Sequence, residues 1–212
     1  MPKELVAIAA QQPILRDYED RPVPDGHVRV KVEFGAPKRG TELTLYRGGR
    51  GAGFPMGLGN MCIGKISEIG KGVEGFSIGD RVAGYGHLKE THTWGAGGLY
   101  RMNDRMTWKE AVCYDPAQFA LSGIRDGQVR IGDRTAVFGL GAIGQMAVPM
   151  LKMAGAECVI VVDPIAIRRE IALKIGADLA LDPTVQDVGA EIKKATGGKG
   201  VDVAVETSGI YE

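Results

Sequence analysis

The sequence predicts an α/β protein whose first half is rich in β-strands and whose second half forms a parallel sheet with crossover helices. From residue 135 onward, four strand-like runs alternate with three helical patterns, and such alternation requires a parallel sheet with right-handed crossovers. Before that point, short strand-like runs are separated by many of the chain's 32 glycines, which is typical of a twisted, loop-rich β-domain. We therefore expect two domains, over 1–117 and 118–212.

In the first half, alternation and turn signals predict four strands and one short helix or turn. Val28, Val30 and Val32 alternate with charged residues, so one face of that strand should be buried. The expected strands cover 4–9, 28–34, 62–69 and 79–83, the last entered through a glycine turn, and the helix or turn covers 39–46.

In the second half, two helices are expected before the alternating region, over 108–114 and 119–126. Strands over 135–138, 158–163, 179–181 and 201–206 then alternate with helices over 142–154, 165–175 and 186–196. Gly155 and Gly176 each follow a predicted helix, as helix-ending glycines do. The sheet is expected to be incomplete at its C-terminal side, because the chain stops after the fourth parallel strand.

A glycine-rich turn lies between the first parallel strand and its helix. It reads Gly139-Leu140-Gly141-Ala142-Ile143-Gly144, and Asp163 follows nineteen residues after its last glycine, at the end of the next strand. This order is the dinucleotide-binding fingerprint. The first glycine allows a tight turn, the second lets a pyrophosphate approach the backbone, and the third lets the helix pack closely on the sheet.

Asp163 decides which dinucleotide is expected. A carboxylate there would accept hydrogen bonds from the adenosine ribose hydroxyls and would repel a 2′-phosphate, so the expected cofactor is NAD. The free N–H groups at the start of the helix that follows the glycine turn favour the negative charge of the phosphates. The alternative is a glycine turn in an unrelated α/β protein.

The composition argues against several classes of partner. The 26 basic and 26 acidic side chains cancel, so neither nucleic acid nor an anionic membrane is expected. No apolar run approaches the roughly 18 residues of a membrane span, and an N-terminal apolar run of six makes a poor signal peptide. Cys62, Cys113 and Cys158 are far apart, which fits reduced thiols in the cytoplasm.

The linked order of several motifs resembles the medium-chain dehydrogenase/reductase superfamily, which contains the zinc alcohol and polyol dehydrogenases. The motifs are Gly-Asp-Arg-Val at 79–82, the glycine turn, Arg168, Ile-Gly-Ala-Asp at 175–178, and the segment from 200 to Thr207. The resemblance implies a chaperonin-10-like (GroES-like) catalytic domain, a Rossmann cofactor domain and NAD-dependent oxidation of an alcohol. It also implies that Arg168 lies near the adenosine ribose, unless it is a solvated helix residue, and that Thr207 faces the cofactor.

The chain departs from this family where the catalytic zinc ligands are expected. Zinc members carry a Cys-Gly-Thr-Asp motif where this chain has Arg39-Gly40-Thr41-Glu42, and Gly-His-Glu where it has Gly59-Asn60-Met61. Arginine cannot ligate a metal, and asparagine and methionine are poor zinc ligands. The four closely spaced cysteines of the family's second zinc are also missing. We expect no metal.

Four residues are candidates for chemistry without zinc. By resemblance Thr41 is the hydroxyl relay, Asn60 would bind the substrate oxygen in place of the metal, and Arg39 would stabilise an oxyanion or pair with a substrate carboxylate or phosphate. Turn and capping roles are the alternatives for Thr41 and Asn60. His87 suits proton transfer.

Two further readings concern neighbouring titratable residues. His87 could form a metal cluster with Glu90 and His92, or all three could be ordinary surface residues. Asp115, before Pro116, could be an acid near the site or simply a helix start.

The expected activity is hydride transfer between nicotinamide and a secondary alcohol, on a sugar- or cyclitol-like small molecule, or the reverse reaction on a carbonyl. The alternatives are a zinc-independent quinone or enoyl reductase, and a non-catalytic dinucleotide-binding protein or inactive fragment. Because family members are longer, the chain is expected to be truncated at its C-terminus, with weak or absent catalysis from these residues alone. The sequence leaves open whether the protein forms a homo-oligomer, because the strands through which family members dimerise are absent from it.

Overall fold

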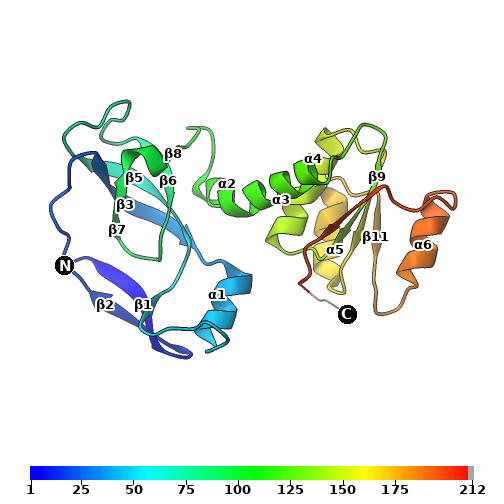
Figure 1. Cartoon of the computed structure of the whole chain (residues 1–212), viewed down its shortest axis with the longest axis horizontal. Coiled ribbons are helices and arrows are strands. Elements are labelled where there is room, and N and C mark those ends of the chain that lie inside the picture. The colour runs from blue at the N-terminus through cyan, green and yellow to red at the C-terminus, as the bar shows by residue number, and fades with distance from the viewer. Residues whose placement is uncertain (210–212) are drawn as a thin grey trace. The chain divides into compact units, whose positions relative to one another are not determined.

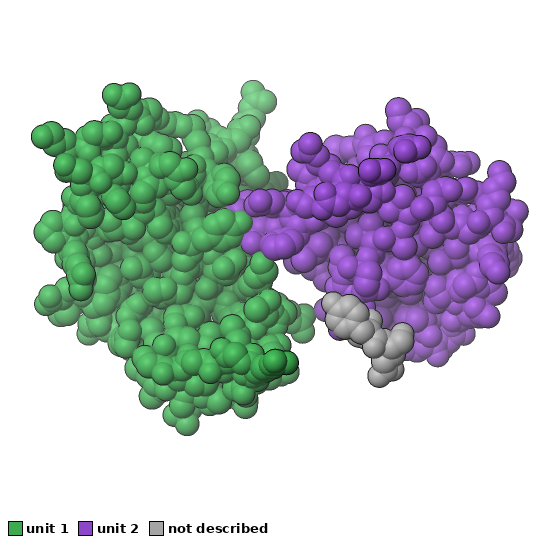
Figure 2. All heavy atoms as spheres, in the orientation of Figure 1, with its two compact units in different colours: residues 1–112 green, residues 113–212 purple. Residues whose placement is uncertain are grey.

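A computed structural model of the chain describes residues 1–209. The chain folds into two compact units, Met1–Val112 and Cys113–Glu212, which Figure 2 draws in green and purple. This division lies before helix α3 (Tyr114–Asp126), whereas a boundary at 117/118 would cut that helix. Helix α3 belongs with the second unit because it packs along α4 (Ala142–Met153).

The first unit contains two antiparallel sheets. The larger has the strand order β7-β3-β5-β6-β8, and the smaller has the order β2-β1-β4. The strands are β1 (Lys3–Ala9), β2 (Gln12–Asp17), β3 (His27–Ala36), β4 (Met56–Gly57), β5 (Met61–Ile69), β6 (Arg81–Tyr85), β7 (Thr91–Gly95) and β8 (Tyr100–Arg101). The helices are α1 (Arg39–Tyr46), the 3-10 turn η1 (Ala96–Gly98) and α2 (Trp108–Ala111).

The four strands predicted for this unit correspond to β1, β3, β5 and β6, and residues 39–46 form a helix rather than a turn. Strand β2 was missed because every residue in it is exposed, which leaves no alternation to recognise. Strand β7 was missed because it contains no aliphatic side chain. It is held by pairing with β3 and by the stacking of His92 on Trp94, whose ring centroids lie 4.5 Å apart.

The core of the larger sheet consists of Val28, Val30, Ile66 and Val82, packed against Trp94 and neighbouring apolar residues. Val28 and Val30 are buried as predicted, both 0% exposed, but the predicted alternation fails at Arg29, which was expected on the wet face and is 5% exposed because it pairs with Asp20 and Glu68. Val32 is only partly buried.

The second unit contains a parallel sheet, as the alternation predicted, and Figure 1 shows it among the helices of this unit. The sheet has four strands in the order β11-β10-β9-β12. Its strands are β9 (Arg134–Phe138), β10 (Cys158–Val162), β11 (Leu179–Leu181) and β12 (Val203–Glu206). Val137, Val159 and Val161 face a cluster with α3, α4 and α5 (Ala166–Lys174). Ala136 and Ile160 face the opposite cluster with α6 (Val188–Ala195). The sheet is thus covered on both faces, as parallel sheets require.

Parallel pairing brings the carboxyl ends of three strands to one edge of the sheet. Val137 is level with Val161 on one side and with Val205 on the other. The residues that follow these strands, namely the glycine turn, Asp163 and Thr207, are therefore neighbours. This edge is where ligands bind in open α/β sheets.

Asp115 lies in the first turn of α3 and is 4% exposed. Pro116 fits beside it because the first turn of a helix leaves its N–H groups unpaired. Across residues 1–209, no helix is both long and apolar enough to cross a lipid bilayer.

Candidate functional site

The glycine turn has the geometry of a dinucleotide loop. Gly139 has a φ of +84°, which a residue with a Cβ rarely adopts. A Cβ on Gly144 would lie 2.0 Å from the Gly139 carbonyl oxygen, so this third glycine lets α4 pack directly on the turn. A Cβ on Gly141 would meet nothing within 4 Å. The backbone is therefore open at the second glycine, where a pyrophosphate must approach.

Helix α4 begins immediately after this opening. Gly141 is its N-cap and supplies no side-chain cap. The positive end of the helix dipole at this point suits phosphate groups. The residues of this unit therefore fit a dinucleotide by their backbone geometry.

Asp163 follows β10 and is 2% exposed. One carboxylate oxygen accepts the Leu140 N–H at 2.7 Å, and the other accepts the Ile165 N–H at 2.8 Å. The Arg168 Nη1 lies 3.3 Å from the first of these oxygens. A carboxylate has about four lone-pair directions, so Asp163 keeps some capacity for a ribose hydroxyl while it also holds the loop.

Two arginines follow Asp163. Arg168, whose side chain is 29% exposed, lies against the carboxylate rather than extending into solvent. Arg169 was not singled out from the sequence. It donates to the Asp163 carbonyl oxygen at 2.6 Å and pairs with Asp182 at 2.9 Å.

Thr207 follows β12, as expected, but its hydroxyl is engaged by the protein. It donates to the Gly139 carbonyl oxygen at 2.7 Å, with the Phe138 carbonyl oxygen at 3.1 Å. Strand pairing places the carbonyl groups of the turn next to this side chain, so Thr207 holds the turn at the strand end where the cofactor is expected.

In the first unit, Arg39, Thr41 and Asn60 lie on two segments that are fastened together. Arg39 and Thr41 are exposed in the first turn of α1, and Asn60 is partly buried. The Asn60 N–H donates to the Ala36 carbonyl oxygen at 3.1 Å. The Glu42 carboxylate accepts the Gly59 N–H at 2.8 Å and the Lys38 N–H at 3.1 Å.

Glu42 fastens these two segments together, a role that sequence reasoning did not assign to it. The available signal was an acidic residue in the first turn of a helix, where a carboxylate can accept backbone N–H groups. The sequence did not show that the same carboxylate would also accept the Gly59 N–H.

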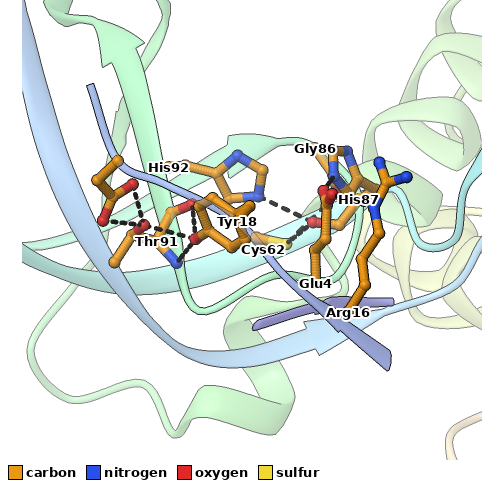
Figure 3. A network of polar contacts seen from close by, with 9 residues as sticks. Glu4, Arg16, Tyr18, Cys62, Gly86, His87, Thr91 and His92 are labelled. Carbon is orange, nitrogen blue, oxygen red and sulfur yellow. Dashed lines mark hydrogen bonds and ion pairs between the residues drawn. The ribbon is translucent and has the colours of Figure 1, made fainter. Parts of the chain in front are cut away.

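His87 lies beside Asn60 along the backbone but turns its ring toward β1. The Gly86 N–H donates to the Asn60 carbonyl oxygen at 3.0 Å, whereas His87 Nε2 lies 2.8 Å from the Glu4 carboxylate (Figure 3). Arg16 Nε contacts the other Glu4 oxygen at 2.7 Å. Burial alone would raise the pKa of Glu4, but the hydrogen bonds from His87 and Arg16 outweigh it and lower that pKa.

The side chains of His87, Glu90 and His92 do not converge on a point. His92 donates from Nε2 to the His87 carbonyl oxygen at 2.8 Å, as Figure 3 shows, and is 6% exposed. Burial lowers the pKa of His92 to about 4. Glu90 accepts the Lys3 N–H at 3.1 Å. The His87 and His92 rings meet edge to face, with centroids 5.8 Å apart, but each of the three side chains is engaged by a separate partner. The metal-cluster interpretation is therefore set aside.

The residues at the family's zinc positions do not fit zinc. A guanidinium at Arg39 and an amide at Asn60 replace a thiolate and an imidazole, and neither is a suitable ligand. In the part of the chain that the structure describes, no three His, Cys, Asp or Glu side chains form a group that could hold a metal ion.

Comparisons with known proteins agree with this geometry. The family described as "Alcohol dehydrogenase GroES-like domain" matches residues 24–148, and the family described as "Zinc-binding dehydrogenase" matches residues 142–212. D-guloside 3-dehydrogenase of Escherichia coli K12 is 47% identical over 234 aligned positions, which cover 98% of this chain and 67% of that protein.

Two solved structures share the fold. 2R,3R-butanediol dehydrogenase from Bacillus subtilis has a TM-score of 0.86 at 27% identity, covering 99% of this chain and 71% of that one. A short chain alcohol dehydrogenase from Escherichia coli CFT073, complexed with NADH, has a TM-score of 0.86 at 25% identity, covering 98% and 69%.

Proposed function

Because the chain belongs to the zinc-type alcohol dehydrogenase family of the medium-chain dehydrogenase/reductase superfamily, we propose that it serves NAD-dependent oxidation of a secondary alcohol without a catalytic zinc. The chain is an alcohol-dehydrogenase-like oxidoreductase that uses a nicotinamide cofactor and a small-molecule substrate. The preference for NAD, the absence of zinc from the chemistry and the substrate class are the parts proposed.

The proposed cofactor preference rests on Asp163. Its buried carboxylate ends the strand next to the glycine turn, where a 2′-phosphate would meet negative charge. Arg168 offsets part of that charge, but it is already held by Asp163. The NADH-bound relative supports the same assignment. When bound, NAD⁺ accepts the hydride from the alcohol carbon.

The proposed zinc-free chemistry rests on Arg39, Thr41 and Asn60. The Asn60 amide would donate a hydrogen bond to the substrate oxygen, and the exposed Thr41 hydroxyl would accept the alcohol proton while passing its own proton to solvent water. The Arg39 guanidinium would stabilise negative charge that develops on that oxygen. His87, whose side chain is 34% exposed and is oriented by Glu4, remains a candidate for proton exchange with solvent.

The proposed substrate is a sugar-like polyol carrying a secondary hydroxyl. The support is the 47% identity to a D-guloside 3-dehydrogenase. The exposed polar residues at the start of α1 suit a hydroxyl-rich ligand better than an apolar one.

The test is nucleotide binding and turnover in chelator-treated protein. NADH and NADPH are titrated by fluorescence, and NAD⁺ reduction is followed with methyl gulosides and with simple secondary alcohols. Tighter binding of NADH and turnover of the gulosides in EDTA are expected. Tighter binding of NADPH would favour a reductase instead. Activity that disappears in EDTA and returns with zinc would show that the zinc-free chemistry is wrong.

A further inference from the structure

We infer that Asp163 and Thr207 act together as positioning residues that fix one peptide group of the cofactor loop, the bond between Gly139 and Leu140. This inference deepens the proposed function, on which it rests, because it states how the loop is held ready for the dinucleotide. It also gives both residues a role beyond direct contact with the cofactor.

The two side chains hold opposite ends of the same peptide group. Thr207 Oγ1 donates to the Gly139 carbonyl oxygen at 2.7 Å, and the Asp163 carboxylate accepts the Leu140 N–H at 2.7 Å. Strand β9 leads into this peptide and lies between β10, which Asp163 follows, and β12, which Thr207 follows. Since the peptide group is planar, holding its oxygen on one side and its N–H on the other sets its orientation.

The groups packed around this peptide restrict its rotation. A Cβ on Gly139 would lie 2.6 Å from the Ser208 backbone nitrogen, so the turn is packed against the segment that follows Thr207. Leu140 is 1% exposed and anchors the other end of the peptide in the core. The Thr207 oxygen also lies 2.9 Å from the position of a Cβ on Gly144, at the first turn of α4.

The consequence is a preorganised loop. A rotation of this peptide would change the path of the chain from Gly139 into Gly141, where the backbone is open. With the peptide held, the N–H groups at the start of α4 keep their direction before a phosphate arrives. Less ordering is then needed on binding, which strengthens affinity.

The test compares three substitutions in the 212-residue chain. Thr207→Val removes the hydroxyl with little change in shape, and Thr207→Ser restores it. Thr135→Val is the matched control, because Thr135 is 0% exposed on β9 and its hydroxyl donates to the Cys158 carbonyl oxygen at 3.1 Å, away from the turn. The measurements are NADH affinity and amide hydrogen exchange of residues 138–145 without nucleotide.

We expect T207V to weaken NADH binding about tenfold, as loss of one hydrogen bond of roughly 1.4 kcal/mol would, and to speed exchange in the turn. T207S should recover most of the affinity, and T135V should stay within about twofold of the parent chain. If T207V binds NADH as the parent does, or loses no more than T135V, the inference is wrong.

Failure of the proposed function is distinguishable from failure of the inference. A parent chain that binds neither nucleotide overturns the proposed function. In that case hydrogen exchange still decides the role of Thr207. Faster exchange of residues 138–145 in T207V than in T135V supports the positioning role, and equal protection in the two variants refutes it.

Discussion

The Gly59 N–H donates to the Glu42 carboxylate at 2.8 Å, joining two segments that are 17 residues apart. The other Glu42 oxygen accepts the Lys38 N–H. One carboxylate therefore ties the turn that carries Arg39 and Thr41 to the segment that carries Asn60. Any chemistry shared by these residues depends on this contact.

Replacing Glu42 should impair turnover more than cofactor binding. Glu42→Ala leaves two backbone N–H groups without their acceptor, at about 1–3 kcal/mol each where they are buried, and frees the two segments to separate. We expect turnover with the best polyol to fall at least about tenfold, with NADH affinity unchanged. Glu74→Ala, at an exposed loop position, is the control. Kinetics of E42A equal to those of E74A would contradict the prediction.

The second and third glycines of the loop should respond differently to alanine. Gly141→Ala meets no atom within 4 Å and should fold normally, yet it should weaken NADH binding about tenfold or more because it fills the pyrophosphate approach. In Gly144→Ala the new Cβ would clash with the Gly139 carbonyl oxygen. Unlike Gly141→Ala, this variant should therefore lose roughly 1–3 kcal/mol of folding stability.

The measurements are NADH titration and thermal unfolding. Gly123→Ala, in α3 with nothing within 4 Å, serves as a control that should be neutral or stabilising. An unchanged NADH affinity in G141A would show that the pyrophosphate does not approach at this glycine.

His92 should make the protein less stable in mild acid. Its folded pKa of about 4 lies below the ordinary value of 6.5, chiefly because the ring is buried. The hydrogen bond to the His87 carbonyl oxygen opposes this shift, as does Asp20 more weakly, whereas the charges of Lys89 and His87 add to it. The folded state therefore binds fewer protons than the unfolded state between these values. The stability is fully present above pH 6.5 and is lost as the pH falls toward 4, by about 3 kcal/mol at most.

The measurement is the free energy of unfolding at pH 7 and pH 5 for the parent chain and for His92→Phe. The phenylalanine can still stack on Trp94 but cannot take up a proton. The drop between the two pH values should shrink in H92F. An equal drop in both proteins would assign the acid sensitivity to other groups.

Arg39 should matter for turnover and not for folding. Its side chain is exposed at the first residue of α1, so Arg39→Ala should leave the melting temperature nearly unchanged. If the guanidinium stabilises charge on the substrate oxygen, kcat should fall about tenfold or more in R39A and less in Arg39→Lys. Turnover by R39A equal to that of the parent would make Arg39 an ordinary surface residue.

Much of the second unit was predictable because its signals are local. Strands β9 and β10 are β-branched runs with turns after them, and the glycines and Asp163 stand at set distances along the chain. Strands β2 and β7 were not predictable, since neither shows alternation of its own and each depends on a partner strand.

The sequence by itself determined the parallel sheet, the glycine turn, the acid after β10 and the loss of zinc-binding side chains, because each depends on residue type and short spacing. Only the tertiary structure decided what the polar side chains hold. Asp163 reaches a backbone N–H 23 residues away, and Thr207 reaches a carbonyl oxygen 68 residues away. Such partners are chosen by strand order and packing, which bring distant backbone groups within hydrogen-bonding distance.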